Sequence, residues 1–301
     1  MIIVIGEILI DRFPEYERIG GAPFNFAFHL KNMGWPVRFI TRIGDDADGL
    51  KARRLIEENG FSTEDVQIDQ THDTGRVEVT LDGKGIPNFE IRKNVAYDHI
   101  DLSSVLTGRG IDAQMIYFGS LIQRTRYGFN QVQELLKQCR PATTRFCDIN
   151  FRAPHINAEA IEPSLNHADI LKLNDEELET ISRTCNGPEQ QTDAIDWLMQ
   201  NHNISMIALT HGADGSTAFT KAQTTCGPLP KGADIKDTVG AGDAFAAVLA
   251  AGALVELPMD RTLELATGFA THMCGLPGAI PKNKEVYASM EKEFERIRNV
   301  Q

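Results

Sequence analysis

The chain has 301 residues, of which 42% are hydrophobic, and this length is sufficient to bury a large core. It carries 30 Lys and Arg against 42 Asp and Glu, a formal net charge of −12, and its basic residues form no run. This balance argues against nucleic acid or an anionic membrane as the main partner. It does not exclude an anionic small substrate, which needs only local positive charge.

The amino-terminal residues form a short apolar run without a preceding basic segment, and they predict a first β-strand rather than a signal peptide. No stretch of the sequence has the length of a membrane span. The five cysteines are odd in number and lack Cys-x-x-Cys spacing. We therefore expect a reduced, cytoplasmic protein without structural zinc.

Short apolar runs rich in β-branched or aromatic residues alternate with amphipathic stretches along the chain. The expected strands are residues 2–5, 37–40, 115–118, 145–149, 170–173 and 206–210, and expected helices include 127–138, 175–184 and 193–202. Such alternation implies right-handed crossovers and a mostly parallel sheet, with ligands at the carboxyl ends of its strands. We expect one α/β domain over residues 1–301.

Two segments interrupt this alternation and predict a small, separate β-sheet. Residues 12–20 follow the first strand, and residues 75–97 alternate apolar and polar side chains around an Asp-Gly pair at 82–83. This pattern is typical of a hairpin. Because an isolated hairpin is marginally stable in water, the sheet should cover a ligand or pair with a second subunit. We therefore expect a homodimer that forms through this sheet.

The segment Gly-Gly-Ala-Pro-Phe-Asn at residues 20–25 opens a helix with an apolar stripe. Its glycines permit close backbone approach to a ligand, and its proline suits a first helical turn. Asn25 can donate to and accept from sugar hydroxyls, and Asp11 can accept from two hydroxyls at once. Each of these two residues, taken alone, equally suits a cap or a turn.

Polar residues also follow three later strands. Arg152 suits a phosphate oxygen or a surface ion pair. Asn174 and Glu177, three residues apart at a helix start, suit magnesium held through its waters, but the spacing favours an N-cap with Glu at N3. Residues 210–215 predict a tight turn whose backbone can contact a nucleotide.

Residues 237–243, Asp-Thr-Val-Gly-Ala-Gly-Asp, run into a helix of small residues and are the most informative segment. Gly240, Ala241 and Gly242 let backbone amides approach a ligand, and the helix adds unpaired amides and the positive end of its dipole. Such a helix start binds anions. Asp243 places a carboxylate beside it, which suits a group that takes a proton from a hydroxyl while the amides hold the moving charge.

Three common motifs are missing from the sequence. It has no Gly-x4-Gly-Lys-Ser/Thr, no Gly-x-Gly-x-x-Gly after the first strand and no Gly-x-Ser-x-Gly. These omissions argue against a P-loop ATPase, an ordinary dinucleotide-binding dehydrogenase and an α/β-hydrolase.

Taken in this order, the motifs resemble those of the ribokinase-like (PfkB) carbohydrate kinases, and within them the fructokinase-like branch. The similarity runs from Gly-Glu at residues 6–7 to Gly-Ala-Ile-Pro at 278–281. The late glycine segment is highly specific, and Gly-Gly-Ala-Pro-x-Asn is typical of fructokinase-like members. The resemblance implies a three-layer α/β/α fold with a small β-sheet lid, ATP as phosphoryl donor, magnesium, and a primary hydroxyl of a sugar, first of all fructose, as acceptor.

The resemblance also implies roles for individual residues. Asp243 is the implied base, and the amides of Gly240, Ala241 and Gly242 are the implied anion hole. The substrate-side residues are Asp11, Gly21, Asn25 and Arg152, and the ATP-side residues are Asn174, Thr210, Gly212 and Gly215. Glu177 is implied to act on magnesium through water, and Asp237, Val239 and Gly278 lie where some members bind potassium through carbonyl oxygens.

Phe24 and Phe26 replace the smaller residues common in the sugar-side helix of the family, which bears on the size of the pocket. Alternative acceptors are another furanose, a keto-sugar acid, which positive charge at Arg92 and Lys93 favours, or a nucleoside. A non-catalytic sugar or nucleotide sensor is the alternative of another class. The intact Asp243 and its glycines argue against a sensor, because a sensor needs no base.

Overall fold

The computed structural model describes residues 1–81, 87–106, 112–232 and 234–298. Within these residues the strands form a nine-stranded sheet in the order β13-β12-β11-β10-β9-β8-β1-β4-β5 and a four-stranded sheet in the order β3-β2-β6-β7. The strands of the large sheet are β1 (Ile2–Ile5), β4 (Val37–Gly44), β5 (Val66–Asp69), β8 (Met115–Gly119), β9 (Thr144–Asp148), β10 (Ile170–Asn174), β11 (Met206–Thr210), β12 (Ser216–Thr220) and β13 (Thr224–Cys226).

The large sheet is parallel from β5 to β11, and β12 and β13 are antiparallel to their neighbours. The expected mostly parallel sheet is therefore confirmed. Every strand and helix that the sequence predicted is present, with ends shifted by up to four residues. The largest shift is in β4, which continues beyond residue 40 to Gly44.

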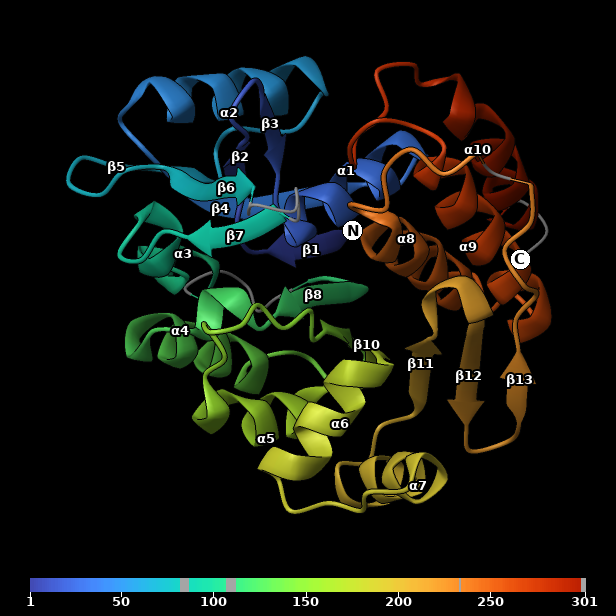
Figure 1. The fold of residues 1–301 in the computed structure, drawn as a ribbon. Coiled ribbons are helices and arrows are strands. Elements are labelled where there is room, and N and C mark those ends of the chain that lie inside the picture. Colours follow the sequence, from blue (N-terminus) through green and yellow to red (C-terminus); the bar gives the residue numbers. More distant parts are fainter. Residues whose placement is uncertain (82–86, 107–111, 233, 299–301) are drawn as a thin grey trace.

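Helices cover both faces of the large sheet and give three layers (Figure 1). One face packs against α1 (Ala22–Asn32), α2 (Ala47–Glu58), α8 (Ala241–Leu254), α9 (Met259–Cys274) and α10 (Glu285–Arg298). The other face packs against α3 (Ser103–Leu106), α4 (Arg126–Lys137), α5 (Ala158–His167), α6 (Asp175–Thr184) and α7 (Gln191–Asn201). Short 3-10 turns lie at Ala96–His99, Leu121–Gln123 and Gly212–Asp214.

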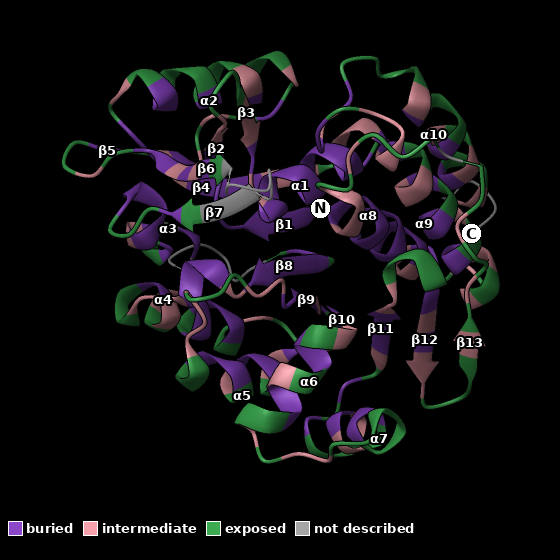
Figure 2. Ribbon diagram, in the orientation of Figure 1, coloured by how far each residue is buried: buried purple, intermediate pink, exposed green. Residues whose placement is uncertain are grey.

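The first strand shows how the sequence builds the two cores. Ile2 and Val4 belong to the hydrophobic cluster under α1 and α8, whereas Ile3 and Ile5 belong to the cluster under α4 to α7. Successive side chains of a strand point to opposite faces, so a strand covered on both sides must be apolar throughout. Figure 2 shows the central strands β1 and β8 buried along their length.

The small sheet consists of β2 (Leu9–Arg12), β3 (Glu17–Gly20), β6 (Gly75–Leu81) and β7 (Pro87–Ile91). It contains the two segments expected to form it, but it begins at Leu9 instead of residue 12. Leu9 and Ile10 are buried, so their apolar character masks the boundary with the first strand. The Asp-Gly pair at 82–83 lies outside the described residues. Among the helices described, none has the length and apolar character of a membrane span.

Candidate active site

The late glycine segment forms the loop that leads into α8. Gly240 is the N-cap of this helix, with φ 79°, and a Cβ added to it would lie 2.2 Å from the Cβ of Ala279. Only glycine therefore allows the loop to pack against the turn at residues 278–279. The amide of Ala241 donates to the carbonyl oxygen of Thr238 at 3.2 Å. A phosphate would have to share this amide, so we expect Gly240 and Gly242 to contribute more to anion binding.

Asp243 lies in the first turn of α8 and is only 7% exposed. Its Oδ2 accepts a hydrogen bond from Nδ2 of Asn25 at 2.8 Å. Burial, followed by the charge of Asp148, raises the pKa of Asp243 to about 6, against the hydrogen bond from Asn25. A carboxylate with this pKa is ionised near neutral pH and still accepts a proton readily.

A cavity of about 570 Å³ opens in front of Asp243 at the carboxyl edge of the large sheet. It brings together residues far apart in the sequence. Those predicted for the site that line it are Asp11, Gly21, Asn25, Arg152, Asn174, Glu177, Thr210, Val239, Gly240, Gly242, Asp243 and Gly278. The carboxyl ends of parallel strands thus converge on one site, as expected for this class of sheet.

A second cavity, of about 450 Å³, adjoins the first, and both are lined by Thr210, Thr238 and Gly242. Of the other predicted residues, Gly212, Gly215 and Ala241 line it, whereas Asp237 is not among the lining residues of either cavity. The hydroxyls of Ser216 and Thr267 also line it, and they are buried without a hydrogen-bond partner within the described part of the chain. Sequence patterns did not single out these two hydroxyls.

The walls of the first cavity carry four carboxylates and two arginines. Burial raises the pKa of Glu7 to about 7 and that of Asp11 to about 6. The positive charge of Arg152, which is exposed at the mouth of the cavity, lowers the pKa of both Glu7 and Asp11 and so opposes the effect of burial. The charge of Arg18 opposes it at Asp11 as well. Glu7 and Arg18 were not predicted as site residues.

Asn25 carries a second feature that points to a ligand. Its Oδ1 is buried and accepts no hydrogen bond from any described residue, while its Nδ2 is occupied by Asp243. An unpaired buried acceptor costs free energy unless a ligand or water donates to it. A hydroxyl bound in the cavity would supply that donor.

Asn174 and Glu177 form the capping box that the spacing favoured. Oδ1 of Asn174 accepts from the amide of Glu177, and Oε2 of Glu177 accepts from the amide of Asn174, both at 2.8 Å. Oε1 of Glu177 accepts from the amide of Phe151 at 2.9 Å. Because the carboxylate is fixed by two backbone amides and still lines the cavity, it fits a magnesium ion held through waters better than direct coordination.

A buried ion pair lies next to the loop at residues 240–242 and was missed by the sequence analysis. Nζ of Lys172 lies 3.1 Å from Oδ1 of Asp148, and Tyr117 donates to Oδ2 of this carboxylate at 3.2 Å. A Cβ added to Gly242 would lie 3.2 Å from Nζ of Lys172, so the ammonium group lies against the first turn of α8. The sequence did contain a signal for one member of this pair, because Lys172 is a charged residue within the otherwise apolar strand Ile170–Asn174.

Two expectations about the sugar pocket were wrong. Phe24 and Phe26 are fully buried in the core, against Phe39 and Tyr117 among others, and do not line the cavity. The helical period turns them away from the face that carries Asn25. Arg92 lies 3.6 Å from Asp73 at the surface, so it does not supply the positive charge of the pocket.

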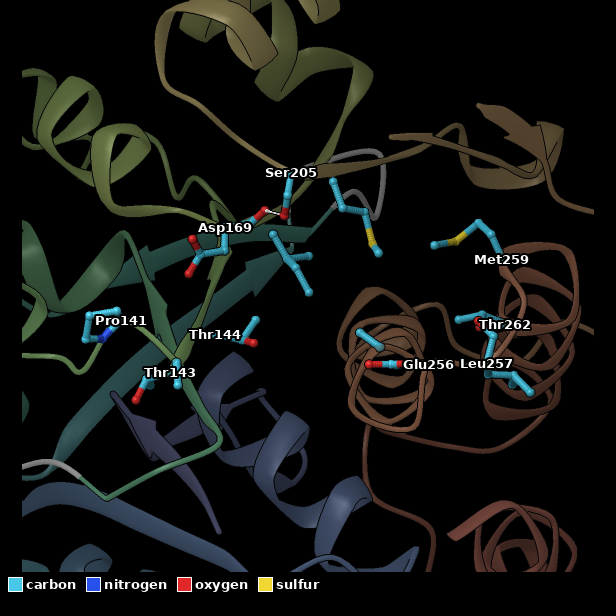
Figure 3. Close-up of a pocket in the computed structure, with 13 residues that line it drawn as sticks. Pro141, Thr143, Thr144, Asp169, Ser205, Glu256, Leu257, Met259 and Thr262 are labelled. Atoms are coloured by element: carbon cyan, nitrogen blue, oxygen red, sulfur yellow. Dashed lines mark hydrogen bonds between the residues drawn. The ribbon is translucent and has the colours of Figure 1, made fainter. Parts of the chain in front are cut away.

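Another cavity, of about 430 Å³, lies at the opposite, amino edge of the sheet (Figure 3). One of its two carboxylates, Asp169, is paired with the guanidinium of Arg145 at 2.7 and 2.8 Å and also accepts from the amide of Arg145 at 2.7 Å. Ser205 donates to the carbonyl oxygen of Asp169 at 2.7 Å. The side chains of Asp169, Ser205, Thr143 and Thr262 in this cavity all have hydrogen-bond partners, which distinguishes it from the cavity at the carboxyl edge.

The three-layer fold, with a carboxylate beside a glycine-rich helix start and two joined cavities, defines a kinase of ribokinase-like architecture. The chain belongs to the pfkB family of carbohydrate kinases, whose model matches residues 2–285. It is 28% identical over 284 residues to a probable fructokinase-5 of Arabidopsis thaliana, and the match covers 87% of this chain and 84% of the relative. It is a fructokinase-like carbohydrate kinase.

Solved structures share the fold over nearly the whole chain. A fructokinase with bound ATP from Xylella fastidiosa superposes with a TM-score of 0.81 at 22% identity and covers 98% of both chains. An aminoimidazole riboside kinase from Salmonella enterica gives 0.81 at 20% identity, covering 97% of this chain and 99% of that one. A Vibrio cholerae fructokinase double mutant with fructose, ADP and potassium gives 0.80 at 19% identity, covering 95% and 97%.

Proposed function

We propose that the protein transfers the γ-phosphate of ATP to a primary hydroxyl of a sugar, with fructose as the first candidate. The observation that carries this proposal is Asp243, a buried carboxylate with a pKa of about 6 that lines the first cavity next to Gly242, a residue that lines both cavities. The fructokinase relatives support fructose as the acceptor.

The acceptor would bind in the cavity in front of Asp243. Asp11 accepts from sugar hydroxyls, and the free Oδ1 of Asn25 accepts from another. Asn25 also holds one oxygen of Asp243, which leaves the other oxygen to receive the proton of the reactive hydroxyl. Phosphoryl transfer has a loose transition state, so the protein mainly positions the reactants and neutralises charge.

ATP would occupy the second cavity, with its γ-phosphate towards Gly242. Apolar side chains such as Ile235, Phe245 and Ala270 offer walls for a flat base, and the unpaired hydroxyls of Ser216 and Thr267 offer hydrogen bonds to it. The amides of Gly240 and Gly242 donate to the transferring phosphoryl group.

Magnesium fits the polar groups at the boundary of the two cavities. Asn174 and Glu177 would hold it through its waters, and when bound it neutralises charge on the phosphates. The ammonium group of Lys172 adds a fixed positive charge near Gly242.

A second class of acceptor, a keto-sugar acid, is favoured by the exposed guanidinium of Arg152 at the mouth of the first cavity. A carboxylate there would form a charge-assisted pair with Arg152. A nucleoside is the third candidate, because a solved structure of the same fold is an aminoimidazole riboside kinase.

A substrate panel separates these candidates. The purified protein is incubated with MgATP and with fructose, other furanoses, keto-sugar acids or nucleosides, and ADP release is measured against a control without acceptor. We expect fructose to give the highest kcat/KM. A higher kcat/KM with an acid or a nucleoside would replace fructose, and no acceptor-dependent ADP release with any compound would support the sensor.

We further propose a homodimer formed through the small sheet, whose outer strands are β3 and β7. Edge strands present unpaired backbone groups to a second copy. The molar mass in solution at assay concentration tests this proposal, and a monomer would contradict it.

A further inference from the structure

An ion pair joins the small sheet to the loop that precedes α8. Arg18, on β3, donates from Nη1 to Oδ2 of Asp237. The guanidinium group lies 4.8 Å from the ring centre of Tyr16 and 5.7 Å from that of Phe13. These two rings stack on each other at 4.5 Å, so they fix the position of the guanidinium.

The carboxylate of Asp237 also receives two backbone amides. Its Oδ1 accepts from the amide of Val239 and its Oδ2 from the amide of Gly278, both at 3.0 Å. A Cβ added to Gly278 would lie 3.6 Å from Nη1 of Arg18. The carboxylate of Asp237 therefore binds the backbone of Val239 and of Gly278, and these three residues are the ones expected to form a potassium site. Arg18 brings a positive charge to the same carboxylate.

These contacts do not fit a potassium ion. A monovalent cation held by carbonyl oxygens at these three residues would also need a nearby negative charge that is not yet balanced. Here both oxygens of Asp237 accept hydrogen bonds, and one pairs with the positively charged guanidinium of Arg18. A second cation at this carboxylate would meet the positive charge of Arg18 at close range.

We propose that the guanidinium of Arg18 takes the place of a monovalent cation beside the anion-binding loop, so that the protein works without potassium. Arg18 lines the first cavity and acts on the loop through Asp237, which makes it a positioning residue. It holds the loop at residues 237–240 in the shape that aims the Gly240 and Gly242 amides at the phosphoryl group. This inference rests on the proposed kinase reaction for its catalytic part.

Thermal unfolding tests the binding part without any sugar. The melting temperature is measured in potassium chloride and in the same concentration of choline chloride for the natural protein, Arg18→Gln, Arg18→Lys and Arg12→Gln. Arg12 is the matched control, because it is in the same sheet and pairs with Glu17 and Asp48 away from the cavity. We expect a rise in potassium of at least about 2 °C for Arg18→Gln alone, since only that variant frees Asp237 for a cation.

Steady-state kinetics with the best acceptor tests the catalytic part. We expect the natural protein, Arg18→Lys and Arg12→Gln to change kcat by less than about twofold between the two salts. Arg18→Gln should lose about tenfold in kcat in choline chloride and recover most of it in potassium chloride, because the loop loses and then regains its cation.

Three results would overturn the proposal. These are potassium activation of the natural protein, an Arg18→Gln variant with unchanged kcat in both salts, and a loss in that variant that potassium does not restore. A protein that phosphorylates no acceptor would instead refute the kinase reaction, and the melting temperatures would still decide whether Arg18 excludes the cation.

Discussion

The two cavities at opposite edges of the large sheet each contain an aspartate, but the two carboxylates have different partners. Asp169, at the amino edge, accepts two hydrogen bonds from the guanidinium of Arg145 and one from its backbone amide. Asp243, at the carboxyl edge, accepts one hydrogen bond from the neutral amide of Asn25. The first arrangement stabilises the fold, whereas the second leaves a carboxylate able to take up a proton.

This difference shows that the carboxyl edge of the sheet is less well stabilised than the amino edge, and the carboxyl edge is where the candidate site lies. At the amino edge the carboxylate of Asp169 is paired with Arg145, and the hydroxyls of Thr143 and Thr262 donate to backbone carbonyl oxygens. At the carboxyl edge Glu7, Asp11 and Asp243 all have raised pKa values, with burial as the main cause. A raised pKa means that the folded protein stabilises the ionised carboxylate less well than water does. Groups of this kind concentrate at functional sites.

The largest expected effect is the loss of the base. Asp243→Asn should keep the fold and lower kcat by at least about a hundredfold, because the amide cannot accept the proton of the hydroxyl. Initial rates of ADP formation at saturating ATP and acceptor measure this effect. Near-normal turnover of a folded variant would remove the assigned role of Asp243.

The next effect concerns the shape of the anion-binding loop. Gly240→Ala should lower kcat by at least about tenfold, because the new methyl group overlaps Ala279 and moves the amides. Gly212→Ala is the matched control, since Gly212 also has a positive φ, 57°, but a Cβ there has no heavy atom within 4 Å. It should cost only about 1 kcal/mol of stability. Equal loss of kcat in the two variants would contradict a role for the loop shape.

The raised pKa of Asp243 has a consequence for stability as well as for rate. The folded pKa of about 6 exceeds the ordinary value of 3.8, so between these pH values the folded protein holds a proton that the unfolded chain has lost. The free energy of unfolding therefore falls as pH rises from about 4 to 6, and above pH 6 the cost is roughly 3 kcal/mol.

Asp243→Asn removes this cost. We expect the variant to be more stable than the natural protein at pH 8 and no more stable at pH 4, as measured by urea unfolding at both values. The natural protein should also lose kcat/KM below about pH 6, where the base becomes protonated. A stability difference that is the same at both pH values would show that the pKa of Asp243 is not raised.

The smallest effect is expected at the opposite edge. Asp169→Asn should lower the free energy of unfolding by about 1–2 kcal/mol, because it weakens a partly exposed, hydrogen-bonded ion pair with Arg145. The kcat of this variant should stay within about twofold of the natural value. A large loss of kcat would mean that the cavity in Figure 3 takes part in the reaction.

The sequence predicted the parallel sheet, the small sheet and most residues of the candidate site, because these depend on local patterns. Glycines at 240 and 242, the Asn174–Glu177 spacing and the strand periodicity each report on a few neighbouring residues. The resemblance to a family then placed the separate motifs in one site. Long-range pairing, such as Lys172 with Asp148 or Arg18 with Asp237, leaves no local signal, since partners 24 and 219 residues apart meet only after folding.

The direction of side chains was the other limit. Phe24, Asn25 and Phe26 are consecutive, yet only Asn25 lines the cavity and both phenylalanines lie in the core. Resemblance alone placed all three near the sugar, whereas the rotation of about 100° per helical residue separates them. The potassium expectation likewise rested on backbone positions and could not foresee the guanidinium of Arg18 at the same carboxylate.

The hydrogen bond between Asn25 and Asp243 also limits how this enzyme can change its acceptor through evolution or engineering. It ties α1 to α8, which meet through small buried residues such as Ala247 and Ala251. A substitution at Asn25 that suits a new substrate would disturb the proton acceptor as well. Variation at Val77 or Ile91, on the small sheet, alters the cavity wall and leaves the reacting groups in place. Libraries aimed at a new substrate should therefore begin there.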